Sequence, residues 1–192
     1  MIHRTFLWNM TLDRRAFLRT GMAGFGSILL MPSCFRQDTS WLFFTAEEAS
    51  CVMALCEQII PADKYGGGAT EAGVIHYIDR QLVAVFDYDQ VVYQQGISAL
   101  QAACLEHYGR RFEALDPAVQ NYICTQLEEN DLVGSDWGDL NQSRFFSLVI
   151  SHTMQGFYGA PRHGGNRNYM SYRMMGLDYP LVVGRNHYRQ LS

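Results

Sequence analysis

The chain has 192 residues, 48% of them hydrophobic and 18% charged, so it is long and apolar enough to bury a sizeable core and is not intrinsically disordered. Its formal net charge of −4 gives no support to nucleic-acid binding. The charge is unevenly placed: residues 34–140 carry 17 acids against five bases, a net −12, and residues 141–192 carry six arginines against one aspartate, a net +5. The body of the protein is therefore acidic and its C-terminal quarter basic.

The N-terminal segment has the pattern of an export signal. Residues 11–19 read TLDRRAFLR, and an uncharged apolar run, MAGFGSILLM, follows at 22–31. This run is shorter than the roughly 20 residues of a transmembrane helix, and a basic region before a short apolar one is typical of a secretory signal. Arg14 and Arg15, with Phe17 and Leu18 behind them, resemble the twin-arginine motif, whose pathway exports folded proteins. A chance arginine pair in a signal for unfolded export is the alternative.

The end of this signal is marked less clearly, because no A-x-A cleavage site is present. The residues MPSC at 31–34 partly resemble a lipoprotein box, in which Cys34 would be the lipidated first residue; otherwise Cys34 is a free thiol. We therefore predict a signal peptide over residues 1–33 and one mature domain over 34–192. The other cysteines form neither CxxC nor CxxCH, so they predict no covalent haem site. Cys51 and Cys56 are predicted to be small core residues.

The mature chain is predicted to be all-α, a single compact domain of about five helices, because no stretch shows the alternation of a strand. The first helix begins at a capping box, Thr45 to Glu48, and ends before Pro61. Asp116 before Pro117 predicts another helix start, and Asn141 a third. The predicted helices span residues 46–60, 71–86, 89–108, 117–129 and 142–155.

Two glycine features interrupt this helical pattern. Three consecutive glycines within residues 63–70 predict a flexible turn, since the segment lacks the lysine and the strand of a phosphate loop. Gly96 lies inside the third predicted helix and indicates either close helix packing or a kink.

Residues 152–175, HTMQGFYGAPRHGGNRNYMSYRMM, are predicted to be an ordered loop region rich in glycine, arginine and aromatic residues. The glycines and the proline disfavour a continuous helix, and the aromatics are too many for a loose linker. Arginines and aromatics dominate protein interfaces, although a surface loop whose arginines cap the protein's own helices is an equal alternative. We expect some arginines to pair internally and others to face a partner. The candidate interface residues are Phe157, Tyr158, Arg162, His163, Arg167, Tyr169, Tyr172 and Arg173.

Three stretches together resemble the gluconate 2-dehydrogenase subunit 3 family. They are FFTAEEASCVMALCEQIIPAD at 43–63, EAGVIHYIDRQL at 71–82 and HTMQGFYGAPRHGGNR at 152–167, and the last is the most specific. The family provides the small, or gamma, subunit of membrane-bound sugar and sugar-acid dehydrogenases. The resemblance covers nearly all of the mature chain, and the twin-arginine leader is also typical of the family.

The resemblance implies a non-catalytic, chaperone-like subunit without a cofactor of its own. Its partners would be a large FAD-dependent subunit of the glucose–methanol–choline type, a multihaem cytochrome c subunit with haem c, and the twin-arginine translocase. The complex would be periplasmic and membrane-associated, with gluconate, glucose, fructose or another polyol as substrate. Two alternatives come from the residues themselves: a free-standing periplasmic enzyme using His76, His107, His152 and His163 with a metal or as acid–base groups, and a module that binds anions through Arg162, Arg167 and Arg173.

Overall fold

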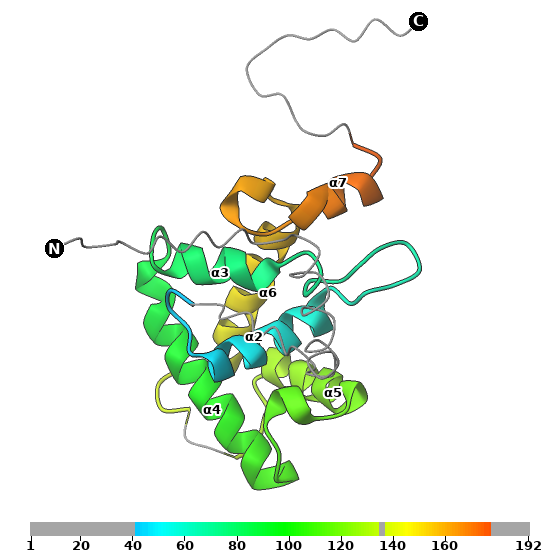
Figure 1. Ribbon diagram of the computed structural model, residues 1–192. Helices are drawn as coiled ribbons and strands as arrows, with labels where there is room; N and C mark the ends of the chain where they lie inside the picture. Colours follow the sequence, from blue (N-terminus) through cyan, green and yellow to red (C-terminus); the bar gives the residue numbers. More distant parts are fainter. Residues whose placement is uncertain (1–40, 135–136, 178–192) are drawn as a thin grey trace, which may run out of the picture. The chain divides into compact units, whose positions relative to one another are not determined.

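The computed structural model describes residues 41–134 and 137–177 (Figure 1). The described ranges contain six α-helices and no β-strand, which confirms the all-α class. The α-helices are α2 (Ala46–Ile59), α3 (Val74–Leu82), α4 (Gln90–Tyr108), α5 (Pro117–Glu129), α6 (Gln142–Tyr158) and α7 (Met170–Met174). Short 3-10 turns are η1 (Asp87–Asp89), η2 (Phe112–Ala114), η3 (Pro161–His163) and η4 (Arg167–Tyr169).

The predicted signal peptide lies outside the described residues. Arg14, Arg15, Phe17, Leu18 and Cys34 therefore stay as predictions from the sequence. Within the described ranges, no helix combines the length and the apolar character needed to cross a membrane.

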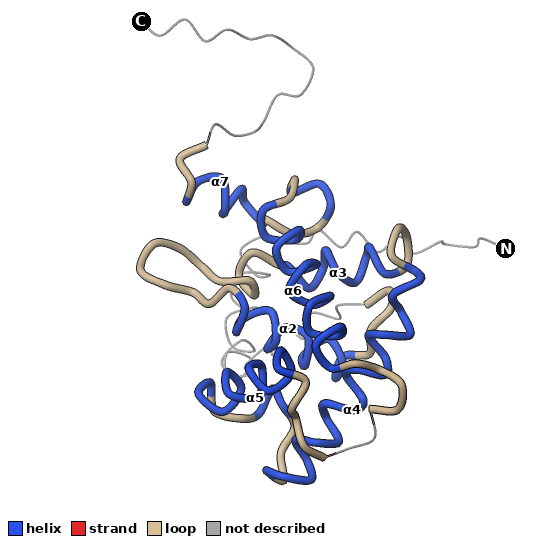
Figure 2. Tube along the Cα trace, turned by 180° about the vertical axis from the view of Figure 1, so that it is seen from behind, coloured by secondary structure: helices blue, strands red, loops and turns tan. Residues whose placement is uncertain are grey.

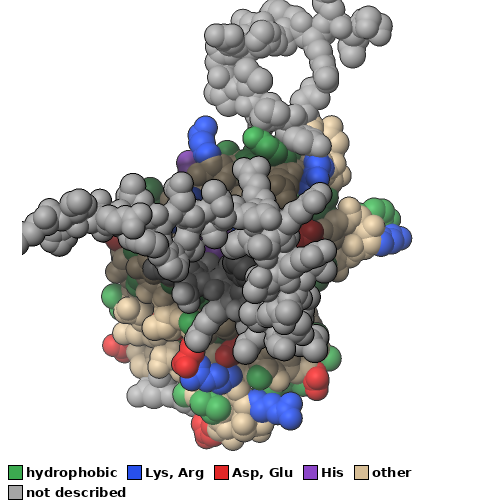
Figure 3. Space-filling model, in the orientation of Figure 1, with side chains coloured by type: hydrophobic (Ala, Val, Ile, Leu, Met, Phe, Trp, Pro, Cys, Tyr) green, Lys and Arg blue, Asp and Glu red, His purple; other side chains and the backbone are tan. Residues whose placement is uncertain are grey.

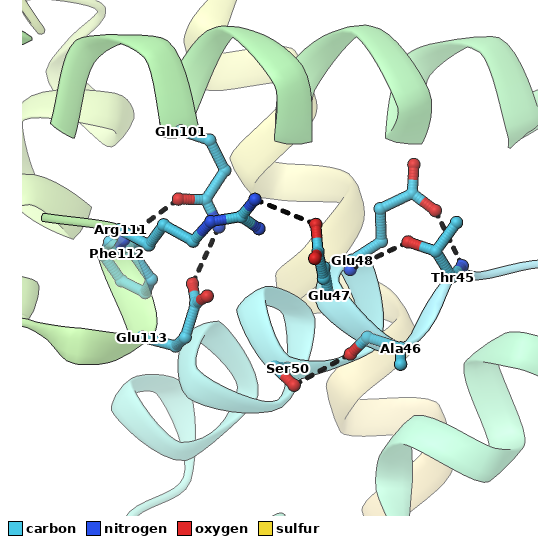
Figure 4. A network of polar contacts seen from close by, with 9 residues as sticks. All are labelled: Thr45, Ala46, Glu47, Glu48, Ser50, Gln101, Arg111, Phe112 and Glu113. Carbon is cyan, nitrogen blue, oxygen red and sulfur yellow. Dashed lines mark hydrogen bonds and ion pairs between the residues drawn. The ribbon is translucent and has the colours of Figure 1, made fainter. Parts of the chain in front are cut away.

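Helix α2 begins at the predicted capping box. The Thr45 side chain accepts a hydrogen bond from the Glu48 amide at 3.2 Å, and the Glu48 carboxylate accepts one from the Thr45 amide at 2.8 Å (Figure 4). The same end of α2 is joined to the chain after α4, because Arg111 donates to Glu47 at 2.8 Å and forms an ion pair with it. The capping box thus fixes the start of the helix, and the Arg111–Glu47 pair links that start to the chain after α4.

Helices α3 and α4 are shorter than predicted. Helix α3 starts at Val74, three residues late, because Gly73 has φ 72° and this left-handed conformation interrupts the helix. It ends at Leu82, and a 3-10 turn precedes α4. Gly96 leaves α4 unbroken, so close packing is the correct alternative: a Cβ there would overlap the ring of Phe145 on α6.

The starts of α5 and α6 agree with the prediction, although one cap differs. The Asn141 side chain accepts from the Arg144 amide at 2.9 Å, whereas Asp116 occupies the cap position of α5 without a side-chain capping bond. Helix α6 continues three residues beyond the predicted end, through Gly156 to Tyr158. The glycine allows a close approach of the two helices, since a Cβ would lie 3.0 Å from the ring of Tyr77 on α3.

Helix α6 is the element around which the core is arranged. It packs against α2, α3, α4, α5 and α7, and Figure 2 shows it from the side opposite to Figure 1. Its fully buried side chains include Phe145 and Phe157. Cys51 and Cys56 are buried as predicted, and the Thr153 hydroxyl donates to the Cys56 sulfur at 3.1 Å. Burial raises the pKa of the Cys56 thiol to about 12, so this thiol stays neutral.

Candidate docking surface

The loop region after α6 is held in place by one buried asparagine. Asn166 has φ 45° and no exposed surface. Its side-chain amide donates to the Gly159 carbonyl at 2.9 Å, and its side-chain oxygen accepts from the Ser171 amide at 2.9 Å. The Arg167 amide adds a bond to the Ala72 carbonyl at 2.9 Å. The expectation that this region is ordered against the helical body is therefore confirmed.

Two glycines let the loop lie directly against the backbones of α6 and α3. A Cβ on Gly165 would overlap the carbonyl oxygen of Gly156, so backbone meets backbone at this point. Gly164, at φ 112°, packs on the backbone of His76, where a Cβ would lie 3.1 Å from the carbonyl oxygen. The GGN sequence thus fixes how the loop crosses both α6 and α3.

The predicted interface residues divide into two groups. Phe157 and Tyr172 are only 1% and 7% exposed, so these two aromatics anchor the region inside the chain and do not face a partner in this conformation. The remaining side chains lie at the surface, Tyr169 with intermediate exposure and the others exposed. The surface group is named the docking surface because it is the candidate for partner binding, and it consists of Tyr158, Arg162, His163, Arg167, Tyr169 and Arg173.

The arginines of the docking surface have no acidic partner among the described residues. The ion pairs in these ranges are Arg111–Glu47 and His152–Asp89. Arg162 donates instead to the ring of His163 at 3.1 Å. The expectation that some of these arginines pair internally is therefore not met in the described ranges. In Figure 3, cationic side chains lie at the surface of the loop region after α6, at the top of the described part.

His76 connects the docking surface with the start of the domain. Its ring stacks on Trp41, with centroids 5.1 Å apart and planes at 20°. Burial lowers the pKa of His76, and the charges of Arg167 and Arg80 lower it further, while Asp79 opposes them. Trp41 and the loop at Gly164 thus pack against the same helix, α3.

Asp79 is a structural residue that the sequence analysis missed. Its buried carboxylate accepts three backbone amides: from Leu42 at 2.8 Å, from Phe43 at 3.0 Å and from Phe44 at 3.1 Å. A signal existed in the sequence, because Asp79 is four residues after Ile75 and therefore lies on the apolar face of its helix. An acid on a core face requires hydrogen-bond donors.

His152 forms a buried cluster with Tyr93 and Asp89. Its Nδ1 lies 3.1 Å from the Tyr93 hydroxyl, and its Nε2 lies 3.8 Å from the Asp89 carboxylate. The His152 ring stacks on Phe86, with centroids 4.5 Å apart, and on Tyr93, with centroids 5.8 Å apart. Burial lowers the pKa of His152 and Asp89 partly opposes the shift. The cluster fills the core between α4 and α6.

We expect the protein to lose stability as the pH falls below about 6.5, the ordinary pKa of histidine. The folded-state pKa of His152 is lowered, so between that value and 6.5 the unfolded chain binds more protons. Urea midpoints at pH 7.5 and 5.5 measure this loss. The loss is expected to be smaller in His152→Gln, while His107→Gln, whose histidine is exposed, serves as the control. An unchanged pH dependence in His152→Gln would contradict the assignment.

The histidines of the enzyme alternative do not form one centre. His152 is in the core, His76 stacks on Trp41, and His163 contacts Arg162. The ring of His107 lies 2.8 Å from the carbonyl oxygen of Val133. Within residues 41–134 and 137–177, no group of three or more His, Cys, Asp or Glu is placed to hold a metal ion.

A groove of about 780 Å³ lies elsewhere, between α4 and residues 137–144. Val92, Trp137, Leu140 and Arg144 are among its lining residues, and none of the predicted interface residues lines it. The groove and the docking surface are therefore separate features.

The fold and the docking surface define a small all-α domain whose C-terminal loops present an ordered group of arginines. The chain belongs to the gluconate 2-dehydrogenase subunit 3 family, whose model matches residues 46–178. The family describes an accessory subunit of a dehydrogenase complex. Comparison with curated proteins and with solved structures gave no match.

Proposed function

We propose that this chain is the non-catalytic small subunit of a periplasmic, membrane-associated flavoprotein dehydrogenase complex. A large subunit of the glucose–methanol–choline type would hold FAD and oxidise a sugar, sugar acid or polyol, and a cytochrome subunit with haem c would accept the electrons. Membership in the subunit 3 family supports the dehydrogenase complex. The twin-arginine-like leader supports export of the complex after folding.

One structural observation carries the proposal of a partner subunit. Arg162, Arg167 and Arg173 are exposed without an acidic partner in the described ranges. Arg162 and Arg167 lie in the turns after α6 and Arg173 lies on α7, and Asn166 joins these segments through its bonds to Gly159 and Ser171. Ordered loops lose little conformational entropy on binding. Arginines that become buried and hydrogen-bonded at an interface have large effects on affinity. The large subunit would therefore present carboxylates to this surface.

Export supplies the test of the proposal, because a flavoprotein that binds FAD in the cytoplasm is exported folded. Arg14→Lys combined with Arg15→Lys is expected to leave the active dehydrogenase in the cytoplasmic fraction when both subunits are co-expressed. Dehydrogenase activity in the periplasmic and cytoplasmic fractions is the measurement. Arg4→Lys, a charge-conserving change outside the motif, is the control. Normal amounts of active enzyme in the periplasm of the double variant would refute the export role.

A further inference from the structure

Residues 61–69, which are part of the connection between α2 and α3, project from the helical body (Figures 1 and 2). They are called the projecting loop. The sequence predicts a flexible turn here, but hydrogen bonds join its two ends. The Glu57 carboxylate accepts from the Ala62 amide at 3.1 Å and from the Thr70 amide at 2.9 Å, so one side chain holds both ends. The Ala69 amide donates to the Ile60 carbonyl at 2.9 Å. The base of the loop is therefore closed.

The turn at the end of the loop is also fixed. The Asp63 side chain accepts from the Tyr65 amide at 2.8 Å and from the Gly66 amide at 3.1 Å, and the Asp63 amide donates to the Gly66 carbonyl at 3.0 Å. The carboxylates of Asp63 and Glu57 thus accept hydrogen bonds from amides within residues 62–70. This arrangement is an Asx-type turn, which needs no partner to form.

Each of the three glycines allows a close contact. A Cβ on Gly66 would lie 2.5 Å from the sulfur of Met174 on α7, and a Cβ on Gly67 would overlap the Glu71 carboxylate. A Cβ on Gly68 would lie 2.6 Å from the Ala62 amide nitrogen. The glycines therefore pack the loop against itself and against α7, and their contact with α7 joins the loop to the docking surface.

The tip of the projecting loop exposes an aromatic ring and a cation. Tyr65 is 73% exposed, and the Lys64 ammonium lies 4.8 Å from the centroid of its ring. Met174, Met175 and Leu177, at the C-terminal end of the described residues, are also exposed. Methionine adapts to varied partner shapes, and tyrosine is enriched among the residues that dominate binding energy. A preformed loop that presents a tyrosine binds with a smaller ordering cost than a flexible one.

We propose that the projecting loop is a second docking element, which inserts Tyr65 into an apolar pocket of the large dehydrogenase subunit. Carboxylates at the rim of that pocket would face Lys64, and further carboxylates beside the pocket would face Arg167 and Arg173. These two arginines, like Lys64, have no acidic partner in the described ranges. This inference rests on the proposed function, and it adds a contact site that lies outside the C-terminal loops. The contact between Gly66 and Met174 places the projecting loop next to α7, so that both elements can reach the same partner.

Titration of the mature chain against the purified FAD-dependent large subunit tests the inference. Tyr65→Ala is expected to weaken binding tenfold or more, about the effect of removing a central interface aromatic, while Tyr65→Phe keeps most of the affinity. Lys64→Glu is expected to weaken binding and to reduce its dependence on salt. The matched controls are Tyr88→Ala, a tyrosine 70% exposed in the turn between α3 and α4, and Arg110→Glu, two residues after the end of α4. Both controls are expected to leave affinity unchanged.

The outcomes separate the inference from the proposed function. If the wild-type chain fails to bind the large subunit, the proposed function is wrong. If the wild type binds and Tyr65→Ala binds equally well, the projecting loop is not a docking element, while the proposed function stands. If Tyr65→Phe loses as much affinity as Tyr65→Ala, insertion of the ring is overturned. Arg167→Ala and Arg173→Ala, measured in the same titration, report on the docking surface independently.

Discussion

Replacing Asp79 with alanine is expected to lower the free energy of unfolding by about 3 kcal/mol or more. The carboxylate accepts three backbone amides of residues 42–44, and its removal leaves these donors without their partner. Hydrogen bonds to a charged group contribute about 1.5–3 kcal/mol each, and bonds that share one acceptor are not additive. Urea unfolding of the mature chain measures the change.

Two further variants make this prediction specific. Asp79→Asn is expected to cost less than alanine, because one oxygen remains as an acceptor while the new NH₂ group cannot accept an amide. Asp87→Ala, which removes an exposed carboxylate in the turn after α3, is expected to change stability by less than about 0.5 kcal/mol. Equal losses of stability in Asp79→Ala and Asp87→Ala would show that the Asp79 carboxylate does not hold residues 42–44 in place.

Gly165→Ala is expected to destabilise the protein by about 1–3 kcal/mol and to detach the C-terminal loops from α6. The added Cβ would overlap the carbonyl oxygen of Gly156, and a backbone atom cannot rotate away as a side chain can. The loop must therefore move, which weakens the bonds that Asn166 makes to Gly159 and Ser171.

Hydrogen exchange separates local detachment from general destabilisation. The amides of Arg167 and Ser171, bonded to Ala72 and Asn166, are expected to exchange faster in Gly165→Ala. The amide of Gln120 in α5 is the internal control, because its bond to Asp116 is far along the chain from the changed contact. Unchanged protection at Arg167 and Ser171 would contradict the assigned contact.

Local chemistry explains why most helix boundaries were predictable. A capping box at Thr45, the proline after α2 and the cap at Asn141 act within a few residues, so their effects are readable in the sequence. The start of α3 was predicted wrongly because the conformation of Gly73 depends on its surroundings. The ring of Phe145 likewise decided that Gly96 is a packing contact, since the two residues are distant in the sequence.

The candidate site was predictable as a region and only partly as a set of residues. Composition located the ordered, arginine-rich loops, but Phe157 and Tyr172 proved to be buried anchors. An aromatic side chain suits a core and an interface equally well, so its type does not tell which surface it covers. The projecting loop was predicted as a flexible turn, because the role of Glu57 in joining its ends appears only when the two ends meet.

The sequence by itself determined the helical class, the caps and the basic character of the last quarter, because these depend on periodicity, neighbouring residues and charge. The tertiary structure decided which side chains are buried, because burial depends on contacts between residues far apart in the chain. Asp79 shows the difference: its place on an apolar helix face can be read from spacing, but its partners, the amides of residues 42–44, are identified only by the fold. The docking surface likewise exists because Asn166 and Gly165 bring the loops across α6.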